Sequence, residues 1–212
     1  MYIPPSNAEH DPAEIFGFIE ANPFGALVTA GGEGLFATHL PLVLHREVRE
    51  RGVLRGHVAR ANRHHRLEVE GEALVIFSGP QAYITPTWYP SKTEHGKVVP
   101  TWNYVAVHVY GSLRWTDDAG WLREHLAALS RVHEAGREHP WSLADAPEEY
   151  IAQQERAIVG VEIAIARMEG KWKMSQNRPA ADIDGVVRGL TASERTTDRE
   201  VGEIVRARKP GA

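Results

Sequence analysis

Cysteine is absent from this chain of 212 residues. Its absence excludes disulfides, iron–sulfur clusters, thiolate zinc sites and cysteine nucleophiles. No apolar run approaches the roughly 18 residues that a membrane span needs, and Met1–Pro5 has neither the basic nor the apolar region of a signal peptide. We therefore expect a cytoplasmic protein with no membrane partner.

The sequence motifs of several enzyme classes are also missing. The chain has no glycine-rich dinucleotide fingerprint, no Walker loop, no His-Glu-x-x-His and no Gly-x-Ser-x-Gly. Its eleven histidines are scattered, and His57, His64 and His65 have no acidic partner at ligand spacing, so we predict no metal site. No side chain stands out as an acid, a base or a nucleophile, and we predict no catalytic residue.

Positive charge is in short supply except near the C-terminus. A net charge of −4 argues against a broad nucleic-acid footprint, which requires a clearly basic surface. The stretch from Lys171 to Ala212 nevertheless holds nine basic and six acidic residues. We interpret it as a solvated helical tail, with an anion-facing or partner-facing end as the alternative.

What the chain does contain is a series of short apolar segments separated by turns. Alternation and turn signals predict strands at Ala26–Ala30, Leu35–Leu44, Val53–Ala59, Ala73–Phe77, Ala82–Tyr89, Thr101–Trp115 and Ile158–Met168, with a turn at Glu169-Gly170. Helices are predicted after Asp11-Pro12, over Arg60–Glu70, after Asp117-Asp118, and at Glu148–Gln154, Asp184–Leu190 and Glu194–Arg208. Many strands and few intervening helices indicate a barrel-like, mostly antiparallel sheet.

The segment Gly56–Asn62 has the features of an anion site. It ends a predicted strand and begins a predicted helix, whose N-terminus would offer free N–H groups to an anion. His57, Arg60 and Asn62 add donors, and Arg60 has the geometry to bind a phosphate with two hydrogen bonds. The alternative is an ordinary capped loop with one surface arginine.

Two further segments are rich in binding-type side chains. Tyr83–Tyr104 holds several Trp and Tyr residues, which suit a planar ligand as well as core or dimer packing. Glu169–Asn177 places Lys171 and Lys173 on one strand face, where they could meet a phosphate. His125 and His133, eight positions apart on a predicted helix, are expected to be surface or interface residues.

Read together, these segments resemble the PaiB family, which is described as FMN-binding negative transcriptional regulators. The resemblance is carried, in chain order, by Met1–Pro4, Ala37–Leu42, Gly56–Asn62, Gly79–Tyr89, Val99–Tyr104, Pro140–Ser142 and Glu169–Asn177. It therefore extends over nearly the whole chain.

The resemblance implies an α+β fold, an antiparallel split β-barrel of the pyridoxamine-phosphate-oxidase type with flanking helices. Residues 1–177 would form the FMN-binding domain and residues 178–212 a helical extension packed on or beside it. Two protomers would pair as a homodimer with FMN in the cleft between them. The cofactor-binding residues implied are Thr38, His39, His57, Arg60, Asn62, Lys92, Trp102, Asn103, Lys173 and Gln176.

Three functions are compatible with this resemblance. The first is a negative transcriptional regulator, a repressor with DNA as a partner, for which Glu194–Arg208 is the one basic candidate helix. The second is an FMN-dependent oxidoreductase of the flavin reductase or oxidase type. The third is a haem-binding split barrel with His39, His57 or His133 as ligand.

Overall fold

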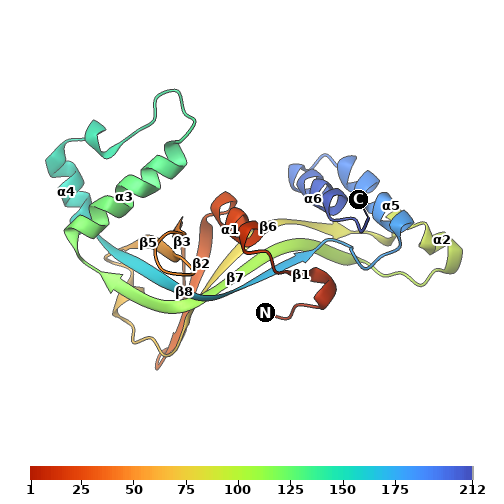
Figure 1. Cartoon of the computed structure of the whole chain (residues 1–212), viewed down its shortest axis with the longest axis horizontal. Coiled ribbons are helices and arrows are strands. Elements are labelled where there is room, and N and C mark those ends of the chain that lie inside the picture. Colours follow the sequence, from red (N-terminus) through yellow and green to blue (C-terminus); the bar gives the residue numbers. More distant parts are fainter. Residues whose placement is uncertain (212) are drawn as a thin grey trace. The chain divides into compact units, whose positions relative to one another are not determined.

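The computed structural model describes residues 1–211, and Figure 1 traces their course. The strands are β1 (Ala8–Glu9), β2 (Phe24–Gly31), β3 (Gly34–Pro41), β4 (Val43–His45), β5 (Val53–Ala59), β6 (Ala73–Ile84), β7 (Thr101–Thr116) and β8 (Ile158–Lys173). The α-helices are α1 (Pro12–Ala21), α2 (Ser91–His95), α3 (Ala119–Glu134), α4 (Glu148–Arg156), α5 (Ala180–Thr191) and α6 (Thr196–Ala207). Short 3₁₀ helices are η1 (Pro5–Asn7), η2 (Arg63–Arg66), η3 (Pro86–Trp88) and η4 (Leu143–Asp145).

The strands form a single sheet in the order β3-β2-β6-β7-β8-β5-β4, and β1 pairs with β8 beside this path. The pairs β1–β8, β2–β3, β2–β6, β4–β5 and β5–β8 are all antiparallel. Strand β3 lies at one end of the order, and β2 is its one strand neighbour within residues 1–211. The predicted α+β class with a mostly antiparallel sheet is confirmed.

The chain packs as two compact units. The terminal unit comprises Met1–Ile15, Ser78–Val107 and the chain from Glu169 onward, and the internal unit comprises Phe16–Phe77 and His108–Met168. Strands β6, β7 and β8 contribute residues to both. The predicted C-terminal extension, with α5 and α6, belongs to the terminal unit.

The internal unit is built around the pairing of β5 with β8. Leu54 of β5 and Ile163 of β8 face each other and are both completely buried. Helix α3 begins at the predicted cap, where the Asp118 carboxylate accepts a hydrogen bond from the backbone N–H of Trp121 at 2.6 Å. At Gly160 of β8 a Cβ would lie 2.3 Å from the Trp121 ring, so the helix packs close to the strand.

The terminal unit is organised around α5 and α6. Val186 and Leu190 of α5 and Val201 and Val205 of α6 are completely buried. Gly185 of α5 meets η3 so closely that a Cβ would stand 1.9 Å from the carbonyl oxygen of Trp88. Beside this contact, Asp182 accepts hydrogen bonds from the backbone and hydroxyl of Ser91 at 3.1 and 2.7 Å.

The prediction of a helix over Arg60–Glu70 is wrong. Only the single 3₁₀ turn η2 forms there, and it is capped by the Asn62 side chain, which accepts a hydrogen bond from His64 N. The turn buries His64 completely, and the chain then extends to Glu70, whose N–H bonds to the carbonyl of Ala30. Tertiary contacts, the burial of His64 and the hydrogen bond from Glu70 to Ala30, therefore replace the helical hydrogen bonds that the polar sequence predicts.

Two predicted strand ends are also wrong. The stretch through Gly79-Pro80 continues β6 to Ile84, after which η3 replaces the rest of the predicted strand. The ladder between β2 and β6 involves Leu74–Ile76 of β6, so Pro80 lies beyond that ladder and removes no hydrogen bond to β2. Strand β8 runs through Glu169-Gly170 without a turn, because β1 pairs with it there.

Candidate functional site

A pocket of about 300 Å³ in the internal unit contains four of the predicted cofactor residues. It is lined by Thr38, His39, Leu40, Pro41, His57, Val58, Ala59, Asn62 and Ile158. These residues come from β3, from the end of β5, from the turn after it and from the start of β8. The structure thus brings together Thr38, His39, His57 and Asn62, which the family resemblance implies as neighbours of one ligand.

A hydrogen-bond network centred on the buried side chain of His64 fixes two of these side chains. The Asn62 amide donates to Thr38 Oγ1 at 3.1 Å, and Asn62 Oδ1 accepts from His64 N at 3.0 Å. The His64 ring lies between Thr38 Oγ1, 2.9 Å from Nδ1, and Thr29 Oγ1, 2.8 Å from Nε2. Burial lowers the pKa of His64, which keeps the ring neutral within this network. His64 is thus a supporting residue that the sequence prediction missed.

The side chain of His57 contacts a second histidine, His125. Its Nδ1 lies 3.1 Å from Nε2 of His125 on α3, and burial lowers the pKa of His57. His125 is only 1% exposed, so the expectation that it lies at the surface is wrong. His133, also predicted as a surface or interface residue, is exposed at the end of the same helix.

Arg60 does not line this pocket. Its Nη2 donates to Asp117 Oδ1 at 2.7 Å and to the carbonyl of Ile158 at 2.8 Å, and its Nε donates to the carbonyl of Arg156 at 2.8 Å. It lines a separate pocket with Asp117 and Glu155. The α-helix N-terminus that was expected to join Arg60 in binding an anion is replaced by η2.

The remaining five predicted residues belong to the terminal unit. Lys92 on α2 is exposed, and Trp102 is 51% exposed with its ring edge-to-face against Tyr83. Asn103 is completely buried, where its amide donates to Ser175 Oγ at 3.0 Å. The structure therefore presents Lys92 and Trp102 to solvent and uses Asn103 internally.

Lys173 and Gln176 lie at and just beyond the end of β8. Lys173 Nζ donates to Thr101 Oγ1, and burial together with nearby Lys171 and Arg178 lowers the pKa of the Lys173 ammonium. Gln176 accepts from the backbone N–H of Met174 at 2.6 Å and donates to the carbonyl of Trp172. Gln176 thus shapes the chain at the end of the strand.

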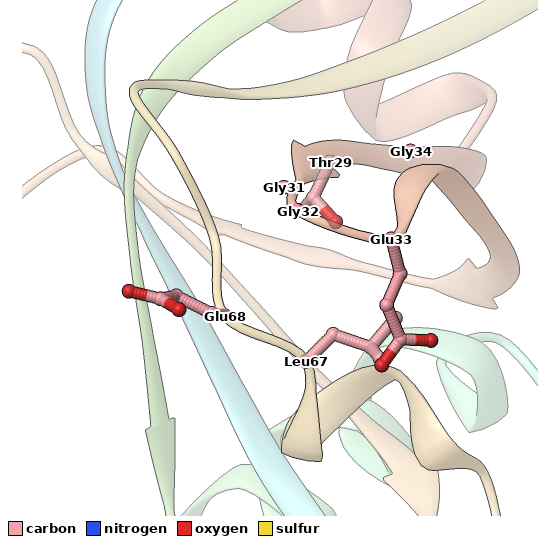
Figure 2. A pocket seen from close by; sticks show the side chains of 7 residues that line it. All are labelled: Thr29, Gly31, Gly32, Glu33, Gly34, Leu67 and Glu68. Carbon is pink, nitrogen blue, oxygen red and sulfur yellow. The ribbon is translucent and has the colours of Figure 1, made fainter.

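Two other pockets of the internal unit differ in character. Figure 2 shows a small one of about 130 Å³ beside the turn Gly31–Gly34, where the carboxylates of Glu33 and Glu68 point away from each other. Ligand pockets usually hold about 300–1,000 Å³, so this one is too small for a cofactor. A wider pocket of about 570 Å³ lies between α3 and residues 140–144.

Residues 1–211 show neither a metal-ligand cluster nor a membrane-spanning helix. Within this range no cluster of three or more His, Asp or Glu side chains has a geometry that could hold a metal ion. No helix in the same range combines the length and the apolar character needed to cross a membrane.

Comparison with known proteins identifies the family. A family described as "Putative FMN-binding domain" matches residues 1–167. Protease synthase and sporulation protein PAI 2 of Bacillus subtilis is 32% identical over 206 residues, covering 97% of this chain and 96% of its own. The chain belongs to the PaiB family. An uncharacterized protein of Emericella nidulans is 34% identical over 244 residues, covering 98% of this chain and 97% of its own. The predicted family is thus confirmed, and FMN is the cofactor that the family description implies.

Solved structures show the same fold at low sequence identity. The flavocytochrome Anf3 of Azotobacter vinelandii gives a TM-score of 0.56 at 15% identity, covering 78% of this chain and 68% of its own. The FAD and haem binding protein of Mycobacterium smegmatis gives 0.55 at 16% identity, covering 79% of this chain and 73% of its own. With the antiparallel sheet, these likenesses confirm the predicted split-barrel fold for this PaiB-family chain.

Proposed function

We propose that this chain is a cytoplasmic FMN-binding protein and that it acts as an FMN-dependent oxidoreductase. The observation that carries the proposal is the pocket that gathers Thr38, His39, His57 and Asn62 from separate elements. The family assignment to residues 1–167 covers every one of these positions.

The chemistry of the lining fits a flavin. Leu40, Val58 and Ile158 supply apolar walls, while Thr38 and Asn62 supply hydroxyl and amide groups held by the His64 network. Mostly apolar walls with a few fixed polar groups are typical of sites for planar cofactors. Because the His64 network holds the side chains of Thr38 and Asn62 in place, these polar groups would orient a flavin without changing their own conformation.

A homodimer would complete this site. The pocket volume of about 300 Å³ is at the lower end of the range for ligand sites, so one protomer would enclose only part of FMN. Beside the pocket, β3 lies at an end of the sheet, and Leu35 and Phe24 are 79% and 63% exposed. An exposed apolar edge strand is a common site of association. We propose that a second copy covers this edge and the open side of the flavin.

Within this proposal the residues have distinct tasks. FMN, when bound, supplies the electron-transfer chemistry, and the protein positions and tunes it. Thr38, His57 and Asn62 hold the polar edge, and Leu40, Val58 and Ile158 exclude water from the ring. Lys92 and Trp102 are the exposed candidates of the terminal unit for contact with the cofactor or a partner copy.

The deciding experiment compares two alanines that are both exposed and close in sequence. Ala59 lines the pocket and Ala61 does not, so Ala59→Trp would fill the site and Ala61→Trp would not. We expect FMN affinity to fall at least about tenfold in Ala59→Trp, because an indole in the pocket displaces the ligand. The visible spectrum after FMN addition and desalting, with light scattering for the dimer mass, measures the effect.

The outcomes separate the alternatives. Retained flavin bands in wild type and Ala61→Trp, with a dimer mass and reduction by a nicotinamide donor, would support the oxidoreductase proposal. A protein that stays colourless with excess FMN would overturn it. A Soret band in the purified protein would instead favour haem.

A negative regulator that binds DNA is the second candidate, favoured by the full-length likeness to PAI 2 of Bacillus subtilis. Three basic side chains near the C-terminus form ion pairs within the chain, which reduces the positive charge available to DNA. The pairs are Arg206 with Glu203, Arg208 with Glu9 and Glu14, and Lys209 with Asp184. DNA binding that weakens steeply as salt rises would support this candidate. Absence of binding at low salt would exclude direct DNA recognition.

A further inference from the structure

The contact between His57 and His125 joins the pocket to the interior of the internal unit. The two rings meet edge to face, with centroids 5.3 Å apart and an interplanar angle of 67°. His57 Nδ1 and His125 Nε2 are separated by 3.1 Å, the distance of a hydrogen bond. Only one of these two nitrogens can donate when both rings are neutral.

The His125 ring is held firmly on its other sides. Trp121, one turn earlier on α3, stacks on it with centroids 5.4 Å apart and an interplanar angle of 25°. The guanidinium of Arg55 lies over the Trp121 ring at 5.4 Å, and Gly160 of β8 leaves no space beneath the indole. His125 therefore has little freedom to change its orientation.

The second nitrogen of His125 decides which atom carries the proton. Nδ1 of His125 is buried and has no hydrogen-bond partner among residues 1–211. A buried N–H without an acceptor raises the free energy of the folded state, and an unprotonated ring nitrogen without a donor raises it less. The neutral ring therefore carries its proton on Nε2 and donates it to His57 Nδ1. His57 in turn must carry its own proton on Nε2.

We propose that His125 is a positioning residue that holds His57 as a neutral Nε2–H donor in the pocket. The consequence is a specificity rule, which rests on the proposed flavin site. The ligand must offer an acceptor, a carbonyl oxygen or an unprotonated ring nitrogen, to His57. The pyrimidine portion of an isoalloxazine has such acceptors.

Burial, together with the nearby charges, keeps the pair neutral. Burial and the neighbouring His57, His45 and Arg55 lower the pKa of His125 to about 3. Arg55 on β5 pairs with Glu162 of β8 at 2.9 Å and with Glu124 of α3 at 3.6 Å. His45 on β4 faces Glu47 at 3.3 Å. No carboxylate among residues 1–211 forms an ion pair with either ring of the pair itself, so neither is stabilised as a cation.

The test measures the tautomer without a ligand and then the affinity with one. Nitrogen-15 NMR of the histidine rings in FMN-free protein should show His57 protonated at Nε2 and bare at Nδ1 at neutral pH. In His125→Leu this preference should relax, and the dissociation constant for FMN should rise roughly fivefold, the effect of one neutral hydrogen bond.

Two variants separate positioning from loss of structure. His125→Gln retains an amide donor for His57 and should restore the tautomer and most of the affinity. His133→Leu changes an exposed histidine of the same helix and should alter neither readout.

The two proposals fail in different ways. A His57 proton on Nδ1 in wild type, or unchanged FMN affinity in a folded His125→Leu, would overturn the inference. The expected tautomer in a wild-type protein that binds no FMN would overturn the proposed function, while the tautomer assignment would stand.

Discussion

At the residue scale, the guanidinium of Arg60 is engaged by its own chain. It bonds to Asp117 and to the carbonyls of Arg156 and Ile158, all within 2.8 Å. We expect Arg60→Ala to lower the free energy of unfolding by about 1–2 kcal/mol, since charge-assisted bonds at a partly exposed site are lost. The dissociation constant for FMN should change by less than about threefold, below the effect of one neutral hydrogen bond. Urea unfolding and flavin titration measure the two quantities.

Arg63 is the matched control for Arg60 on the same segment. Its guanidinium pairs with Glu33 at 3.0 Å, with both side chains more than half exposed. Arg63→Ala should change the unfolding free energy by less than about 1 kcal/mol. Loss of flavin in Arg60→Ala with unchanged stability would give Arg60 the phosphate role that the sequence of Gly56–Asn62 predicts.

At the element scale, the packing of α5 against η3 depends on a missing side chain. A Cβ at Gly185 would stand 1.9 Å from the carbonyl oxygen of Trp88, and backbone cannot yield as a side-chain tip can. We expect Gly185→Ala to destabilise the protein by about 2–4 kcal/mol through this overpacking. Thermal and urea unfolding measure it.

Gly17 on α1 provides the control for the helix effect. A Cβ there meets nothing within 4 Å, so Gly17→Ala should be neutral or stabilising by up to about 1 kcal/mol. If the two substitutions have equal effects, the close contact at Gly185 does not determine the stability of α5.

Sequence patterns predicted elements well where burial follows the local period. Strand β5 matches the predicted Val53–Ala59 exactly, and β7 exceeds its prediction by one residue. The failures at Arg60–Glu70 and at Glu169-Gly170 arose where distant partners decide, the His64 network and the β1 ladder respectively. The polarity and glycine content of a segment cannot predict contacts with residues that are distant in the sequence.

In the candidate site, four residues that line the pocket were predicted and two residues that support them were missed. Thr38 and His39 were predicted through the family resemblance, and His57 and Asn62 also from the donors of Gly56–Asn62, and the fold brings all four into one pocket. His64 and His125 were missed as supports because their partners are 26 and 68 positions away in sequence. Only the folded chain shows that these two rings are buried.

At the scale of the whole molecule, three buried histidines make stability depend on pH. Burial lowers the pKa of His57, His64 and His125 below the ordinary value of 6.5, for His125 to about 3. Below about pH 6.5 the unfolded chain binds protons at these positions that the native state does not. Stability is therefore complete above pH 6.5 and is lost as pH falls toward the native pKa values. Each such histidine contributes a slope of up to about 1.4 kcal/mol per pH unit.

Urea unfolding at half-unit steps between pH 7.5 and 5 would measure this slope before the carboxylates contribute. Hydrogen bonds and ion pairs to arginine lower the pKa of Glu9 and Glu162 despite partial burial, so their stabilising effect is lost only below the ordinary glutamate pKa of 4.5. His125→Gln should reduce the slope of unfolding free energy against pH by the contribution of one buried histidine. His133→Gln, at an exposed position, should leave the slope unchanged. An unfolding free energy that stays constant from pH 7.5 to 5 would contradict the neutral, buried state of all three rings, because a proton excluded from the native protein must be taken up on unfolding.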